Sequence, residues 1–205
     1  MLSQMHPLVI RLLEDKDFVE IGSNSDLVLD LRYATDNNFM GKNVYHDFNR
    51  AFLHRVAADK FSIAKQKLKQ VKPDWKFILF DCLRPVWAHQ QLWDFVAGTP
   101  QQDYVADPKR GSLHSYGFAI DLSLVDENDE PVDMGTDFDS FEDLAQPKYE
   151  SMMLANNKLT RKQYDNRLIL RQVMEFAGFI QLSFEWWHYD AEPGNLVRGN
   201  YRIIG

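Results

Sequence analysis

Two histidines of this sequence stand near carboxylates at spacings that could hold a metal ion. His114 is followed seven residues later by Asp121, and Glu185 precedes His188 by three residues. A catalytic zinc ion takes three His or carboxylate ligands and keeps one position open for water. His114, Asp121 and His188 would fill that quota, with Glu185 as an additional acidic neighbour. The pattern therefore allows a site for one Zn²⁺ per chain, built from two distant stretches of sequence.

A purely structural explanation exists for the same residues. His114 could be a loop histidine, Asp121 could cap backbone amides at a strand end, and the two tryptophans before His188 could be core aromatics. However, Asp121 lies between Ile120 and Leu122, and a buried charge needs a partner. A neighbouring cation explains Asp121 better than chance, although a Lys or Arg would serve as well as a metal.

The other four histidines lack such acidic neighbours. His6 lies in the N-terminal segment, His46 in an Asn-rich loop, and His54 and His89 in segments with helical patterns. We expect solvated or hydrogen-bonded side chains at these four positions. The single cysteine, Cys82, can form neither an internal disulfide nor a cysteine-rich metal site, so His and carboxylates must supply any ligands.

The candidate ligands can meet only if the backbone is interrupted twice. On one straight strand, His114 and Asp121 would lie on opposite faces, and Gly117 can supply a bend between them. Glu185 and His188 would also lie on opposite faces of an extended strand, whereas a turn or bulge at the two tryptophans between them brings them together. We therefore predict a bend at Gly117 and an irregularity before His188.

Periodicity predicts the elements around these residues. Alternating patterns indicate strands at 27–33, 76–80, 118–124 and 179–184, with a possible hairpin partner at 131–134. One face of the strand at 118–124 is apolar and the other is small and polar. Three-and-four spacing predicts helices at 50–71, from Pro85 to about residue 97, and at about 160–177. Helices and antiparallel-looking hairpins in this order favour an α+β fold.

Composition limits the class of protein. The 205 residues are 45% apolar and 26% charged, which fits one globular domain spanning 1–205 and excludes disordered and collagen-like chains. The net charge of -7 argues against nucleic acid and anionic membranes as partners. No membrane span or signal peptide is visible, so we expect a cytoplasmic protein, or a periplasmic one if the chain is a processed form. The oligomeric state is left open.

Five motifs resemble, in the same order, those of the VanX-like D-alanyl-D-alanine dipeptidases, a family of zinc peptidases. SLHSYGFAID at 112–121 is similar to the family's SxHxxGxAxD motif, and EWWHY at 185–189 is similar to its ExxH element. The other three are LRYATDNNFMG at 31–41, DCLRP at 81–85 and MGTDFD at 134–139. One departure is Leu83, where the family often has an aromatic residue before the Arg-Pro pair.

This resemblance implies a role for individual residues. His114, Asp121 and His188 would bind zinc, Glu185 would be the general base, and Arg84 would assist the transition state. The resemblance also implies a hedgehog/DD-peptidase-like fold with a central antiparallel sheet flanked by helices. The implied activity is hydrolysis of the dipeptide D-alanyl-D-alanine to two D-alanines.

Two further residues are candidates for substrate binding, because a dipeptide has two charged ends. Asp139 could contact the ammonium group, or it could be the N-cap of a short helix starting near Ser140. Ser112 could hydrogen-bond the substrate or the metal shell, or it could serve a simple turn. The loop at 37–41 could narrow the entrance so that only small peptides enter.

Two other functions fit the same residues. A D,D-carboxypeptidase or peptidoglycan endopeptidase of the same zinc family would act on longer substrates. A non-catalytic zinc-binding interaction domain is the alternative from another class, and Glu185 argues against it, because a binding module needs no base. Whether the enzyme recycles cell-wall fragments or confers resistance to glycopeptide antibiotics depends on context outside the chain.

Overall fold

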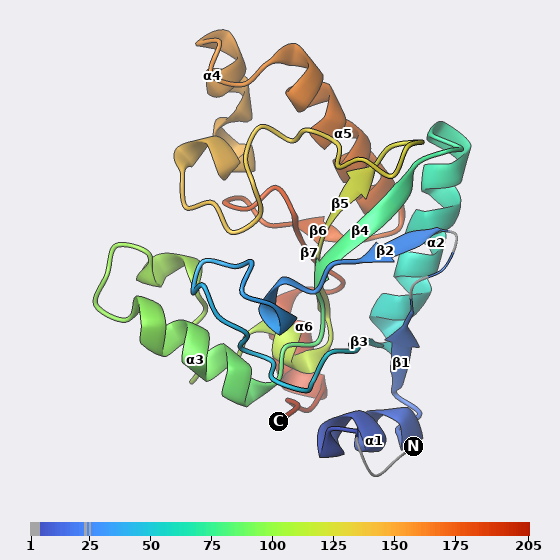
Figure 1. Cartoon of the computed structure of the whole chain (residues 1–205), viewed down its shortest axis with the longest axis vertical. Helices are drawn as coiled ribbons and strands as arrows, with labels where there is room; N and C mark the ends of the chain where they lie inside the picture. The colour runs from blue at the N-terminus through green and yellow to red at the C-terminus, as the bar shows by residue number, and fades with distance from the viewer. Residues whose placement is uncertain (1–4, 23, 25) are drawn as a thin grey trace.

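The computed structural model describes residues 5–22, 24 and 26–205 (Figure 1). Helix α1 and the C-terminus lie at the lower end of Figure 1, where Arg202 forms an ion pair with Asp15. The helices are α1 (Pro7–Glu14), α2 (Arg55–Val71), α3 (Val86–Val96), α4 (Glu150–Ala155), α5 (Arg161–Phe176) and α6 (Gly194–Asn200). The strands are β1 (Phe18–Ile21), β2 (Leu27–Leu29), β3 (Ala51–His54), β4 (Lys76–Asp81), β5 (Ala119–Val125), β6 (Ile180–Gln181) and β7 (His188–Asp190).

A five-stranded sheet in the order β2-β4-β5-β7-β6 forms the centre of the molecule. Its neighbouring strands are antiparallel except for β2 and β4, which are parallel. The expected α+β fold with a central antiparallel sheet is thus confirmed, and the β2–β4 pair at one edge is parallel. The chain between β2 and β4 includes helix α2, and a long crossover of this kind allows two strands to run in parallel.

The helix expected at 50–71 begins later than its periodicity suggests. Residues Ala51–His54 form β3, which pairs with β1 in a separate two-stranded antiparallel sheet. Helix α2 begins at Arg55, and the Val56 amide donates a hydrogen bond to His54 Nδ1 at 3.3 Å. Cross-strand pairing with β1 therefore overrides the helical pattern until His54 caps the helix.

The central strand β5 is buried on both faces. Every residue from Ala119 to Val125 is buried, so other parts of the chain cover both faces of the sheet at this strand. The expectation of an apolar face and a small polar face holds for the residue types. It follows that the polar side chains of Asp121 and Ser123 are buried inside the protein and need partners there.

The remaining elements follow the sequence patterns to different extents. Helix α5 begins with a capping box at Thr160 and ends before Gly178, whose φ is 85°. The strand expected at 27–33 ends at Leu29, and the one at 179–184 shortens to β6. The hairpin partner expected at 131–134 is a single bridge between Pro131 and Val125. Within the described residues, no helix combines the length and the apolar character that a membrane crossing requires.

Candidate active site

The register of the central sheet places three polar residues in one row. Asp81 of β4 is paired with Asp121 of β5, and Asp121 is paired with His188 of β7. Directly opposed residues on neighbouring strands point to the same face of a sheet. A shift in register between Leu79 and Asp81 brings Asp81 into this row. Three chain segments therefore present their polar side chains to the same space.

His114 reaches this space from a turn that precedes β5. The 3-10 helix Leu113–Tyr116 ends at Gly117, whose φ of 73° lies in the left-handed region that glycine adopts without strain. A Cβ at Gly117 would lie 2.8 Å from the backbone nitrogen of His54, so there is no room for a side chain. The predicted bend at Gly117 is confirmed.

The predicted irregularity before His188 is also confirmed. The chain turns at Trp186 and Trp187 and becomes extended again at His188. The indole Nε1 of Trp186 donates a hydrogen bond to Thr136 Oγ1 at 2.8 Å, which fixes the turn against a neighbouring segment. As a result, Glu185 Oε2 lies 3.8 Å from His188 Nδ1, on the same side of the chain.

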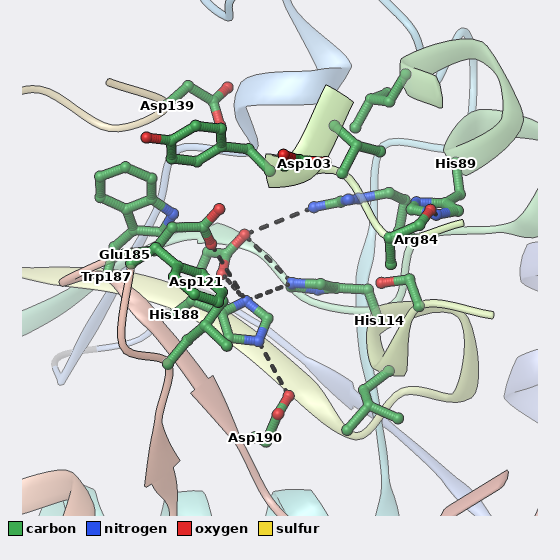
Figure 2. A pocket seen from close by; sticks show the side chains of 18 of the residues that line it. Arg84, His89, Asp103, His114, Asp121, Asp139, Glu185, Trp187, His188 and Asp190 are labelled. Atoms are coloured by element: carbon green, nitrogen blue, oxygen red, sulfur yellow. Dashed lines mark hydrogen bonds and ion pairs between the residues drawn. The ribbon is translucent and has the colours of Figure 1, made fainter. Parts of the chain in front are cut away.

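Both ring nitrogens of each of the two histidines have a polar partner (Figure 2). His114 Nδ1 lies 2.7 Å from the carbonyl oxygen of Cys82, which can only accept, so this nitrogen is the donor. His188 Nε2 lies 2.9 Å from Asp190 Oδ1 and Nδ1 lies 2.9 Å from Asp121 Oδ1, so either nitrogen of this ring can donate to a carboxylate. When each neutral imidazole carries its proton on the outer nitrogen, Nε2 of His114 and Nδ1 of His188 are bare acceptors.

These two bare nitrogens converge with a carboxylate. His114 Nε2 lies 3.2 Å from His188 Nδ1 and 3.3 Å from Asp121 Oδ2, and His188 Nδ1 lies 2.9 Å from Asp121 Oδ1. One ligand atom from each residue lies within 4.8 Å of the other two. With the imidazole protons on the outer nitrogens, these three acceptors cannot satisfy one another, whereas a cation satisfies all three. Two imidazoles and a carboxylate, with the outer imidazole nitrogens already hydrogen-bonded, fit a divalent metal such as zinc.

Two carboxylates of the site, those of Asp121 and Glu185, have shifted pKa values. Burial raises the pKa of Asp121, but the nearby imidazoles of His114 and His188 outweigh it and hold this pKa below its ordinary value. For Glu185, burial is the largest effect and raises the pKa to about 7, although His188 opposes it. Asp121 therefore stays ionised as a ligand, while Glu185 can exchange a proton near neutral pH.

Arg84 is held rigidly beside this centre. Its Nε and Nη2 donate to Asp81 Oδ2 at 2.9 and 2.8 Å, and Nη2 lies 3.6 Å from Asp121 Oδ2. The Tyr33 ring packs 4.9 Å from the guanidinium carbon, and the Tyr45 hydroxyl donates to Asp81. The predicted strand-to-helix position of Arg84 is confirmed, since it lies between β4 and α3.

The two candidate substrate-binding residues both line the cavity. Asp139 has a φ of 62° and accepts a hydrogen bond from the Tyr33 hydroxyl at 3.0 Å, while its Oδ2 is buried without a partner. No helix starts near Ser140, since the next helical turn is Asp143–Ala145, so the N-cap alternative is wrong. Ser112 is buried at the start of the turn that carries His114.

A cavity of about 460 Å³ brings all of these groups together. Its wall includes every residue that the sequence predicted to be catalytic, metal-binding or substrate-binding, namely Arg84, Ser112, His114, Asp121, Asp139, Glu185 and His188. The predicted loop 37–41 contributes Phe39 to the wall, next to the Phe141 ring at 5.4 Å. Tyr104 packs on Phe141 at 5.3 Å and donates its hydroxyl to the Phe141 carbonyl. Aromatic side chains from three loops therefore meet beside the polar centre.

Sequence reasoning missed three residues of this site. Asp81 was visible only as part of a motif, and Asp190 only as a carboxylate two positions after His188, on the same strand face. His89 forms the expected hydrogen bond, from Nε2 to the Ala106 carbonyl at 2.8 Å, but no sequence signal placed it in the cavity wall.

The other histidines lie outside this cavity wall. His6 and His54 accept hydrogen bonds at the N-termini of α1 and α2, as expected for hydrogen-bonded side chains. His46 lies in its loop, stacked on Trp87.

Known dipeptidases are similar to this chain over most of its length. The family model described as D-Ala-D-Ala dipeptidase matches residues 15–202. A D-alanyl-D-alanine dipeptidase of Escherichia coli (strain K12) is 35% identical over 169 residues, which are 80% of this chain and 79% of the relative. A D-alanyl-D-alanine dipeptidase of Enterococcus faecium is 32% identical over 177 residues, covering 78% of this chain and 83% of the relative. A dipeptidase of the same name from Synechocystis is 29% identical over 156 residues, covering 62% and 63%.

The family match spans nearly the whole chain, and the two relatives above 30% identity each align with more than three quarters of it. The His114, Asp121 and His188 centre provides a place for the metal on which such enzymes depend. The chain therefore belongs to the D-Ala-D-Ala dipeptidase family of metallopeptidases.

Proposed function

We propose that this protein is a zinc-dependent dipeptidase that hydrolyses D-alanyl-D-alanine to two D-alanines. The observation that carries the proposal is the convergence of His114 Nε2, His188 Nδ1 and an Asp121 oxygen, with Glu185 beside them in the cavity. His114, Asp121 and His188 are the proposed zinc ligands. The names of the relatives support the choice of substrate.

Bound zinc would supply a lowered pKa for a water molecule and polarisation of the peptide carbonyl. Glu185 accepts the proton of the attacking water and returns it to the departing amine. Its side chain is 15% exposed, and its pKa of about 7 suits both proton transfers near neutral pH. The position of Glu185, three residues before a ligand, keeps its carboxylate close to the reacting bond.

Arg84 stabilises the negative oxygen that develops on the substrate carbonyl. Its side chain is 9% exposed and its guanidinium is fixed by Asp81, so it is oriented before the substrate arrives. Asp139 provides a carboxylate for the substrate ammonium, because its Oδ2 has no hydrogen-bond partner among the residues that the structure describes. Ser112 is a proposed hydrogen-bonding partner of the substrate.

Zinc stoichiometry measured together with hydrolysis tests this proposal. We expect one zinc per chain and cleavage of D-alanyl-D-alanine, with L-alanyl-L-alanine cleaved far more slowly. Glu185→Ala should keep its zinc and lose at least about a hundredfold in kcat, whereas Glu130→Ala, at an exposed turn, should behave as wild type. Zinc loss from the Glu185 variant would make Glu185 a ligand and overturn its assignment as the base.

The length of the accepted substrate distinguishes a dipeptidase from a D,D-carboxypeptidase of the same zinc family. The aromatic side chains of Phe39, Tyr104 and Phe141 narrow the space next to the centre, which favours a short substrate. Equal rates on D-alanyl-D-alanine and on a blocked pentapeptide ending in D-alanyl-D-alanine would refute the dipeptidase assignment in favour of a D,D-carboxypeptidase.

A further inference from the structure

Two arginines outside the predicted site also line the cavity, Arg110 and Arg198. Arg198 lies on α6, where its Nε donates to the Arg110 carbonyl and its Nη2 to the Gly111 carbonyl, each at 3.0 Å. Gly111 directly precedes Ser112 in the segment that leads to His114. These hydrogen bonds hold the Arg198 guanidinium against the part of the cavity wall that carries a proposed zinc ligand.

Gly194 makes room for this guanidinium. Gly194 also lines the cavity, and a Cβ at this position would collide with Nη1 of Arg198. The missing side chain lets the charged group lie close to the backbone at the cavity wall. Because Nε and Nη2 are used by the two carbonyls, Nη1 is the part of Arg198 that is available to a ligand.

The two guanidinium groups are not neutralised by the protein. Among residues 5–22, 24 and 26–205, no carboxylate forms an ion pair with Arg110 or Arg198, although the chain has more acidic than basic residues. Burial lowers the pKa of Arg198, and the nearby charge of Arg110 lowers it further. Arg84, in contrast, is paired with Asp81. Two like charges in one cavity wall favour an anionic ligand between them.

The charge of the cavity differs between its two sides. Figure 2 shows Asp139 and Asp190 on opposite sides of the His114 and His188 pair. Arg198 is an electrostatic neighbour of Asp190, whose Oδ1 is occupied by His188 Nε2. One side of the histidine pair therefore presents Asp139, and on the other side Arg198 is a neighbour of both Asp190 and Arg110. A free dipeptide has a matching polarity, with an ammonium group at one end and a carboxylate at the other.

We propose that Arg110 and Arg198 bind the C-terminal carboxylate of the dipeptide, an inference that rests on the proposed dipeptidase function. A guanidinium binds a carboxylate through paired N–H groups and keeps its charge at every physiological pH. With the ammonium at Asp139 and the carboxylate at the arginines, the peptide bond is directed to the centre between them. The enzyme would then require a free carboxylate and reject a dipeptide that lacks one.

The test compares D-alanyl-D-alanine with its C-terminal amide, which has the same shape without the negative charge. We expect wild-type kcat/KM to be at least about tenfold higher for the acid, since a hydrogen bond to a charged group is worth about that factor. Arg110→Gln should lower kcat/KM for the acid by about tenfold and leave the amide unchanged. This variant keeps the hydrogen bonds of Arg198, because Arg110 contributes only its backbone carbonyl to them.

A second variant and a control complete the design. Arg198→Gln combined with Arg110→Gln should remove the remaining preference for the acid. The control is Arg202→Gln. Arg202 follows α6, pairs with Asp15 and lies outside this cavity wall, so the variant should keep the preference for the acid over the amide. A purely structural role for the two arginines would lower kcat/KM for acid and amide by the same factor.

Two results would overturn the inference while leaving the dipeptidase function intact. The first is wild-type kcat/KM that is equal for acid and amide, and the second is an equal loss on both compounds in Arg110→Gln. If the zinc-loaded wild type cleaves neither compound, the proposed function itself is refuted, and the inference about Arg110 and Arg198 falls with it.

Discussion

Replacing Asp81 with Asn removes the negative charge that balances Arg84 inside the protein. Asp81 is fully buried, and its Oδ2 accepts two hydrogen bonds from Arg84, at 2.9 and 2.8 Å. Asn has the same size, so the change creates no cavity, and its cost arises from the unpaired buried charge. Removing one partner of a buried ion pair costs about 3–5 kcal/mol. Because Asp121 Oδ2, 3.6 Å from Arg84 Nη2, offsets part of this cost, we expect a loss of about 3 kcal/mol in the free energy of unfolding.

Urea and thermal unfolding in the presence of a chelator measure this loss without the contribution of bound metal. A loss of about 3 kcal/mol should lower Tm by roughly 6–12 °C for a chain of this length. The kcat for D-alanyl-D-alanine should fall by about a hundredfold or more, because the guanidinium is no longer held for the transition state. Asp74→Asn, at an exposed position, is the matched control. An unfolding free energy equal to that of the control would refute Asp81 as the charge that balances Arg84.

Two further predictions concern acid stability and the bend before β5. Burial lowers the pKa of His89 from 6.5 to about 4, so the unfolded chain binds a proton first as pH falls. The contribution of His89 to the free energy of unfolding is full above pH 6.5 and should fall by about 3 kcal/mol towards pH 4. His89→Gln keeps a donor to the Ala106 carbonyl and should show a shallower fall of the unfolding free energy with pH, measured by urea unfolding in the presence of a chelator. An identical slope in the variant and the wild type would contradict this. Gly117→Ala places a Cβ 2.8 Å from the backbone nitrogen of His54, so it should lower the free energy of unfolding by about 2–3 kcal/mol and weaken zinc binding. Gly199→Ala, with open space around it, should have neither effect. Equal effects of the two substitutions would contradict the steric argument.

The sequence predicted the local features of the site well, because they depend on neighbours along the chain. The bend at Gly117 and the turn before His188 follow from the faces of a strand, since the candidate ligands could not meet otherwise. The strand-to-helix position of Arg84 follows from Pro85, which suits the first turn of a helix. Each of these inferences needs only a few consecutive residues and their known conformational preferences.

Features that depend on distant partners could not be predicted in the same way. Residues Ala51–His54 continue a helical pattern in the sequence, yet they pair with Phe18–Ile21. The position of His89 in the cavity wall depends on how α3 packs. Asp81 and Arg84 are close in sequence, but only the register of β4 against β5 shows that their ion pair borders Asp121. Periodicity reports which face is apolar and carries no information about which strand lies opposite.

The register of the sheet also explains how three polar groups can lie side by side in a buried row. Because side chains alternate between faces, a one-residue slip of β7 against β5 would turn His188 away from Asp121 and bring Tyr189 to that face. Pairing on the other edge opposes the slip, since Gln181 of β6 faces Tyr189 and donates to its hydroxyl at 2.9 Å. The short strand β6 therefore contributes no ligand but fixes the strand that does. The row Asp81, Asp121 and His188 is thus a consequence of pairing on both sides of β7 and β5. We expect substitutions at Gln181 to act on the candidate metal centre through this register and through the loss of the Gln181 hydrogen bond to the Trp186 carbonyl.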